Sequence, residues 1–101
     1  MSWKSGLKLA TWNVRTLSSP GAATVVEDEI ERYGLDILAM QEVRWPGIGE
    51  HELRCGSILF SGRHDDVHRQ GVGIYLTRKP RSALIDFDGV NERILRIRLD
   101  T

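Results

Sequence analysis

The sequence has very little cysteine, no long apolar run and no net charge. Cys55 is the single cysteine, which excludes a disulfide framework and a cysteine-based zinc site, and we expect it to be a small buried or half-buried filler. No segment approaches the roughly 20 consecutive apolar residues of a membrane-spanning helix. The 14 basic residues balance 14 acidic ones and 41% of residues are hydrophobic. This composition indicates a folded domain and gives no sign of strong non-specific attraction to nucleic acid.

The first residues do not form a secretory signal, because they contain no apolar core segment. We predict a disordered leader over residues 1–6 and one domain over residues 7–101, with no repeat, low-complexity tract or linker. The expected location is intracellular rather than secreted, with the nucleus left open, and no membrane partner is expected.

A strand, a helix and a second strand are predicted in order over residues 7–42. Residues 7–14 are rich in β-formers, with apolar side chains on both faces, which favours a buried strand. Ser19 is the predicted N-cap of the helix and Pro20 its first residue, where a missing N–H costs nothing. Residues 37–40 are a continuous apolar run that predicts the second strand.

Helical periodicity is clear between the two strands, and Gly34 is the predicted C-terminal stop. The residues at helical spacing that predict a core-facing stripe are Ala22, Ala23, Val26, Ile30 and Tyr33. The charged residues predicted to fill the other side are Glu27, Asp28, Glu29, Glu31 and Arg32.

Two polar residues stand where the predicted strands end. Because a strand–helix–strand crossover makes the strands parallel, Asn13 and Glu42 should share one carboxyl edge of the sheet, where ligands bind in open α/β folds. A carboxylate there can hold a hard divalent cation, and an amide can orient a phosphate. The alternative is that Glu42 is a solvated strand-end acid and Asn13 a turn former.

The Gly/Pro-rich residues 43–50 predict a loop beside this edge. Arg44 could contact a phosphate and Trp45 could stack on a base. The alternative for Trp45, which we favour, is packing on the edge of the domain.

The remaining residues predict an antiparallel meander. Strands are expected at residues 57–61, 71–77, 83–87 and 93–99, with a basic turn at 78–81 and another turn at 88–92. The loop at 62–70 holds two histidines and two aspartates, which raise a metal-site hypothesis. We favour a plain loop, because no matching ligands occur elsewhere. The four residues are His64, Asp65, Asp66 and His68.

Residues 11–17 and 36–42 resemble the opening of the endonuclease/exonuclease/phosphatase superfamily. Its hallmarks are a Trp-Asn pair closing the first strand and a Gln-Glu pair closing the second. Residues 11–17, 29–45 and 69–76 carry a closer similarity to endonuclease domains of non-LTR retrotransposons and to the related craniofacial-development-protein-2-like sequences. The resemblance covers about residues 8–99.

The resemblance implies a metal-dependent phosphodiesterase that acts on DNA. It makes Glu42 the ligand of a catalytic Mg²⁺ or Mn²⁺ and gives Asn13 the role of holding the phosphate. Many abasic-site enzymes of the family carry an acid two residues after this asparagine, where this chain has Arg15. An arginine cannot ligate a cation, so Arg15 either pairs with a DNA phosphate or faces solvent.

The family fold is a four-layered α/β sandwich usually well over 200 residues long, and its further catalytic residues lie in an Asp-x-Asn and a Ser-Asp-His motif. Neither motif occurs here. We therefore expect an α/β fold with a mixed sheet, the amino-terminal half of such a domain, with one apolar sheet face bare. Such a chain would be marginally stable alone, would self-associate, or would come from a truncated gene model. The alternatives to a DNA endonuclease are an inactive interaction or nucleic-acid-binding fragment and a phosphatase of small phosphate esters.

Overall fold

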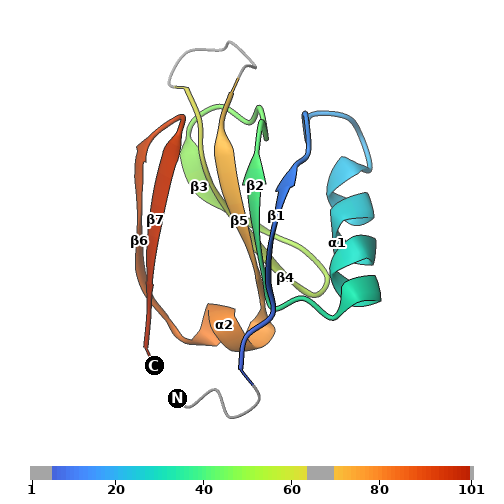
Figure 1. The fold of residues 1–101 in the computed structure, drawn as a ribbon. Helices are drawn as coiled ribbons and strands as arrows, with labels where there is room; N and C mark the ends of the chain where they lie inside the picture. Colours follow the sequence, from blue (N-terminus) through green and yellow to red (C-terminus); the bar gives the residue numbers. More distant parts are fainter. Residues whose placement is uncertain (1–5, 64–69, 101) are drawn as a thin grey trace.

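A mixed five-stranded sheet forms the centre of the fold, with a helix on one face and a two-stranded hairpin on the other (Figure 1). The computed structural model describes residues 6–63 and 70–100. The four candidate ligands in the 62–70 loop and all but Gly6 of the predicted leader lie outside these residues. In chain order the elements are β1 (Leu9–Asn13), α1 (Ala22–Tyr33), β2 (Ile37–Gln41), β3 (Ile48–Glu52), β4 (Gly56–Ser61), β5 (Val72–Thr77), α2 (Arg78–Ser82), β6 (Leu84–Asn91) and β7 (Ile94–Leu99).

The strand order in the large sheet is β1-β2-β5-β4-β3. β1 and β2 are parallel, as the crossover predicted, and every other pairing in this sheet is antiparallel. The β3-β4-β5 meander therefore returns to pair with β2. β1 lies at the sheet edge rather than inside it, and Leu9 is 65% exposed, so the prediction of a buried first strand is wrong.

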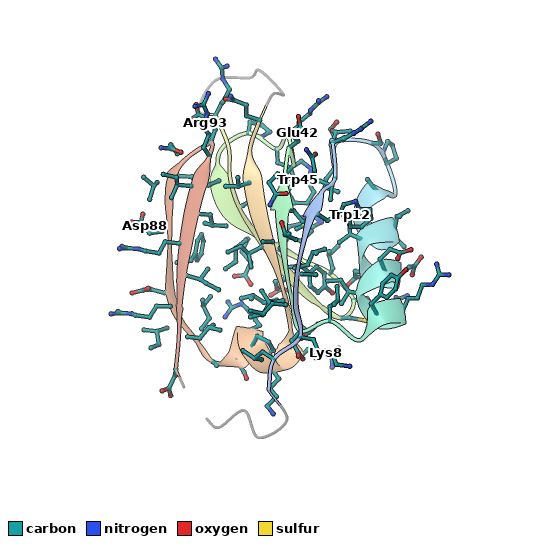
Figure 2. All side chains as sticks on the ribbon, viewed as in Figure 1. Lys8, Trp12, Glu42, Trp45, Asp88 and Arg93 are labelled. Atoms are coloured by element: carbon teal, nitrogen blue, oxygen red, sulfur yellow. The ribbon has the colours of Figure 1, made fainter. Side chains whose placement is uncertain are left out.

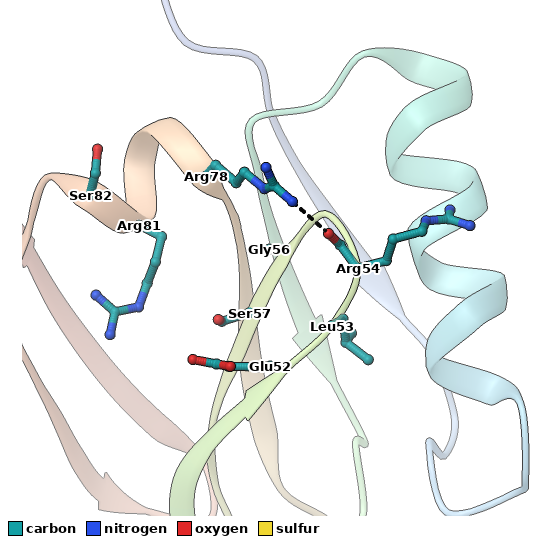
Figure 3. Close-up of a pocket in the computed structure, with 8 residues that line it drawn as sticks. All are labelled: Glu52, Leu53, Arg54, Gly56, Ser57, Arg78, Arg81 and Ser82. Atoms are coloured by element: carbon teal, nitrogen blue, oxygen red, sulfur yellow. Dashed lines mark hydrogen bonds between the residues drawn. The ribbon is translucent and has the colours of Figure 1, made fainter.

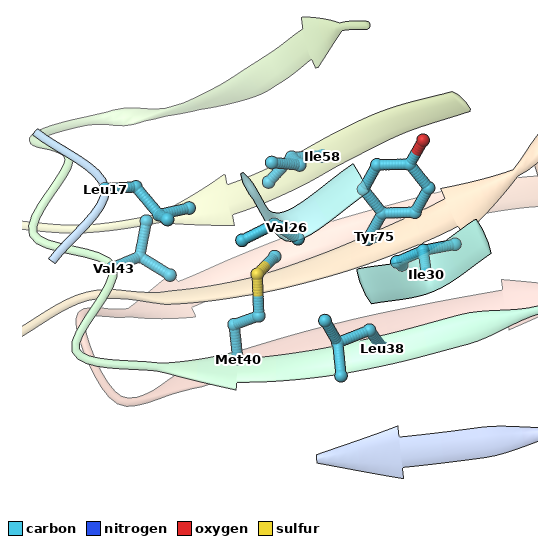
Figure 4. Packing of buried hydrophobic residues seen from close by; sticks show 8 residues of the cluster. All are labelled: Leu17, Val26, Ile30, Leu38, Met40, Val43, Ile58 and Tyr75. Atoms are coloured by element: carbon cyan, nitrogen blue, oxygen red, sulfur yellow. The ribbon is translucent and has the colours of Figure 1, made fainter. Parts of the chain in front are cut away.

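The main core lies between α1 and the large sheet. Val26 and Ile30 of α1 pack on Leu38 and Met40 of β2 and on Tyr75 of β5 (Figure 4). All five side chains are at most 2% exposed, and burial of a side chain of this size contributes about 1.5–3 kcal/mol. This stripe is what holds the helix against the sheet.

The predicted composition of the helix faces needs two corrections. Tyr33, placed in the apolar stripe, is 62% exposed, because it lies in the last turn, beyond the edge of the core. Glu27, placed on the outer face, is only 3% exposed, because its carboxylate accepts a hydrogen bond from the buried hydroxyl of Tyr75. A partnered carboxylate is tolerated where an unpaired one is costly.

β6 and β7 form a sheet of their own rather than the last strands of the first one. The hairpin lies over β4 and β5 on the face opposite α1, where Gly89 packs closely. A Cβ atom on Gly89 would lie 2.8 Å from Cγ2 of Ile48 and 2.9 Å from Oγ of Ser61. The second sheet face is therefore partly covered, and the expectation of a wholly bare face is wrong.

Four other local predictions are also wrong. The helix starts at Ala22 after Gly21 in a left-handed conformation, so Ser19 and Pro20 precede it. Residues 48–52 form β3, and residues 78–82 form the short helix α2, where a loop and a turn were predicted. The β6–β7 turn falls at residues 92–93 rather than 88–92, because the bulged strand β6 continues to Asn91. Within the described ranges, no helix has the length and apolar character needed to cross a membrane.

Candidate active site

Asn13 and Glu42 meet at one edge of the sheet, as the sequence predicted. In the parallel register Asn13 pairs with Gln41, and the N–H of Val14 donates to the carbonyl of Gln41 at 3.1 Å. Glu42 follows Gln41 directly. The topology therefore places an amide and a carboxylate on adjacent strand ends, and their chemical roles stay predictions.

The side chain of Asn13 is half engaged. Its Oδ1 accepts the backbone N–H of Arg15 at 3.2 Å, which fixes the amide at the start of the loop. Its Nδ2 has no acceptor among the residues that the structure describes. The amide can therefore donate a hydrogen bond to an oxyanion at this edge.

Glu42 adopts a left-handed backbone conformation with φ 58°. Strict alternation along β2 would turn its side chain to the helix-covered face, together with Met40. Glu42 instead lines an open groove of about 340 Å³ on the hairpin side, with Glu92 and Arg93 of the β6–β7 turn. It is half-buried and has no hydrogen-bond or ion-pair partner within residues 6–63 and 70–100.

The backbone is unusual throughout this edge. Every non-glycine residue with positive φ in the described ranges lies here: Arg15, Glu42, Arg44 and Gln70. Such conformations cost roughly 1–2 kcal/mol each for L-residues. They persist because the residues after β2 bond to the residues before β5. The N–H of Val43 donates to the carbonyl of Gly71 at 3.0 Å, and the N–H of Arg44 donates to the carbonyl of Gln70 at 2.7 Å. Backbone strain of this kind concentrates at functional sites.

The structure separates the three candidate nucleic-acid contacts. The guanidinium of Arg15 is exposed beside Asn13 and makes no ion pair within the described part of the chain. Arg44 is half-buried in the loop after Glu42, with its backbone bonded to Gln70. Trp45 takes the packing alternative: its Nε1–H donates to the carbonyl of Leu17 at 3.0 Å, and its ring lies edge-on to Phe60 at 5.2 Å. Base stacking by Trp45 stays a prediction.

Glu92 and Arg93 are the site residues that sequence reasoning missed. They lie in the β6–β7 turn, which is bonded to the edge through Gly71 N–H and Glu92 O at 3.0 Å. The predicted turn at residues 88–92 contained Glu92 but ended before Arg93, so the two residues were not recognised as one turn at this edge. The alternation of β7 offered the only signal, since it starts one residue after Arg93.

The donor set fits a magnesium ion held mainly by solvent and substrate. Glu42 supplies one carboxylate at a strand end, without a partner in the described ranges, and Mg²⁺ commonly binds one or two carboxylates together with waters and substrate phosphates. The described ranges contain no cluster of three or more His, Cys, Asp or Glu side chains that could enclose a metal. A closed, all-protein site of the zinc type is therefore not formed by these residues.

A second polar pocket, of about 290 Å³, lies at the opposite end of the sheet, between α2 and the β3–β4 turn (Figure 3). Its arginines are already engaged. Arg81 forms a bidentate pair with Glu50 at 2.6 and 2.9 Å, which holds the pKa of that carboxyl below its usual value. Arg78 donates to the backbone carbonyl of Arg54 at 3.2 Å. The arginines of this pocket therefore hold α2 against the sheet.

Comparisons with known proteins match most of the chain to one family. The profile of the Endonuclease/Exonuclease/phosphatase family matches residues 10–98. Two curated relatives named craniofacial development protein 2, from Bos taurus and Tragulus javanicus, are 34% and 32% identical over 90 residues. These residues are 89% of this chain and 15% of each relative, so the chain corresponds to a small part of their length.

Proposed function

The chain belongs to the endonuclease/exonuclease/phosphatase family, as its motifs predicted, and on that premise we propose that it carries the metal-binding edge of a DNA endonuclease of retrotransposon type. The observation that supports the proposal most is the pairing of Asn13 with Gln41 at the end of β2. This pairing brings Asn13 next to Glu42, whose carboxylate has no partner among the described residues. The proposal covers this edge alone, because the family's downstream motifs are not in the sequence.

Each residue has a distinct part in the proposed reaction. Glu42 would hold Mg²⁺ or Mn²⁺ at the groove, and the metal would supply Lewis-acid polarisation of a phosphoryl oxygen. Asn13 donates its Nδ2–H to the phosphate and fixes its orientation. Arg15, two residues on, adds a guanidinium that pairs with a neighbouring phosphate of the DNA. The described residues that line the groove include no histidine.

Supercoiled-plasmid nicking in the presence of Mg²⁺ tests the proposal. We expect the wild type to convert supercoiled to open-circular DNA, and Glu42→Gln to lose this activity while keeping the shape of the side chain. EDTA should abolish nicking, and Mn²⁺ should restore it. Glu52→Gln is the matched control, because Glu52 is an exposed carboxylate at the other end of the sheet.

The result that would contradict an active edge is equal nicking by Glu42→Gln and the wild type. Absence of nicking by a folded wild-type protein would favour a second candidate, a module that binds nucleic acid without cleaving it. Hydrolysis of a small phosphate ester under the same conditions, without nicking of the plasmid, would support the phosphatase alternative.

A further inference from the structure

The exposed guanidinium of Arg93 stands in the same groove as the candidate metal ligand. Figure 2 shows Arg93 and Glu42 at the same end of the molecule, although 51 positions separate them in the sequence. Both line the groove of about 340 Å³ at the end of β2, together with Gln41 and Gly71. Arg93 also borders the adjoining sheet surface formed by Ala39 and Ile74.

The turn that carries Arg93 is firmly held by its backbone. The Oδ1 atom of Asn91 accepts the N–H groups of Arg93 at 2.8 Å and Ile94 at 3.0 Å. The fully buried hydroxyl of Ser61 donates to the carbonyl of Asn91 at 2.7 Å. Together with the bond from Gly71 to Glu92, these contacts tie the turn to β4 and to the start of β5. The position of Arg93 therefore does not depend on its own side chain.

Within the described residues the charge of Arg93 has no ion-pair partner, unlike that of the other arginines of the hairpin. Arg96 pairs with Asp88 at 3.2 Å and Arg98 with Asp86 at 2.8 Å. Arg93 makes no ion pair with any residue that the structure describes, although the carboxylates of Glu42 and Glu92 line the same groove. A guanidinium cannot ligate a cation, so it can share this groove with a metal only by binding an anion between them. A phosphate is the anion whose geometry matches a planar fork of donors.

We propose that Arg93 is a phosphate-binding residue that holds the DNA backbone at the groove beside Glu42. This inference rests on the proposed function, because that function supplies the phosphodiester. It adds a residue from the second sheet to an edge otherwise built from β1, β2 and their loops. The hairpin thus contributes to substrate binding as well as to the cover of the sheet.

The test measures DNA binding without metal, so it does not depend on cleavage. A short fluorescein-labelled duplex is titrated in EDTA, followed by anisotropy, at salt concentrations between about 50 and 200 mM. Arg93→Gln should lower the affinity about tenfold and reduce the slope of log K against log salt by about one. Arg96→Gln is the matched control: it removes the same charge from the same hairpin, but from an arginine already paired, and should change neither quantity.

Two results would overturn the inference: a wild type that does not bind the duplex, or equal effects of Arg93→Gln and Arg96→Gln. Arg93→Lys keeps the positive charge but loses the planar, forked set of N–H donors. Compared with Arg93→Gln, it should recover the wild-type salt slope and only part of the wild-type affinity. Circular dichroism melts should be unchanged in all three variants, since none of the turn's hydrogen bonds uses a side chain of Arg93 or Arg96. If the wild type binds through Arg93 and still does not nick plasmid, the proposed endonuclease fails while this phosphate contact remains.

Discussion

The buried hydrogen bond between Tyr75 and Glu27 should be a main determinant of stability. Tyr75 is 0% exposed and Glu27 3% exposed, and the phenol hydroxyl donates to Oε2 of Glu27 at 2.5 Å. The same oxygen accepts the backbone N–H of Cys55 at 2.8 Å. One carboxylate of α1 thus joins the helix to β5 and to the β3–β4 turn.

Tyr75→Phe removes the hydroxyl and keeps the ring, so it creates almost no cavity. A hydrogen bond to a charged group contributes about 1.5–3 kcal/mol, and the buried carboxylate is left with one fewer donor. We therefore expect the free energy of unfolding to fall by about 2 kcal/mol. For a domain of this size that corresponds to a fall in Tm of roughly 10 °C.

Urea and thermal denaturation followed by circular dichroism measure this change, with Tyr33→Phe as the matched control. Tyr33 is 62% exposed in the last turn of the same helix, so its hydroxyl should matter by less than about 0.5 kcal/mol. Equal stability of Tyr75→Phe and the control would refute the reasoning, because the buried bond would then provide no net stabilisation.

The same pair predicts a dependence on alkaline pH. Burial, and then the hydrogen bond to Glu27, raise the pKa of the Tyr75 phenol above its ordinary value of 10.0. A group whose pKa is raised by folding stabilises the protein fully below the unfolded-state pKa and loses that contribution as pH rises toward the folded-state value. The stability difference between the wild type and Tyr75→Phe should therefore shrink above about pH 10.

Two further predictions concern the candidate site and the open part of the sheet. Gly71 has φ +95°, and a Cβ atom there would lie 3.1 Å from the N atom of Arg44, so Gly71→Ala should cost about 1–2 kcal/mol in urea denaturation; unchanged stability would show that these two loops can relax. The exposed Leu9 lies on the edge strand β1, and we expect sedimentation velocity to show self-association that Leu9→Lys weakens; a wild type that is monomeric at every concentration would contradict this.

The sequence was sufficient for the elements whose pattern is local. The apolar run before Gln41 predicted β2, and the helical spacing of Val26 and Ile30 predicted α1. The polar ends of two parallel strands predicted that Asn13 meets the end of β2. Crossover handedness and periodicity are properties of the chain itself, so they can be read without a structure.

The errors come from residues whose environment is set by distant partners. Residues 48–52 contain Gly49 and directly follow Pro46 and Gly47, and they become β3 only because β4 pairs with them. Glu27 has the composition of a surface residue, and a tyrosine 48 positions away makes its burial tolerable. The groove-facing orientation of Glu42 depends on a left-handed backbone that the sequence does not reveal, since that conformation is favoured by glycine rather than glutamate.

The position of β5 beside β2 also has a consequence for folding. β2 pairs on one side with β1, which the chain has already made, and on the other with β5, whose residues come 31 to 39 positions later. β3 and β4 are synthesised between them, yet they join the sheet only through β5. The nascent chain must therefore keep β2 half-paired until Thr77 has left the ribosome, and non-local pairing of this kind slows folding and leaves an apolar strand edge open to other chains. The metal-ligand candidate at the end of β2 becomes rigid only after that step.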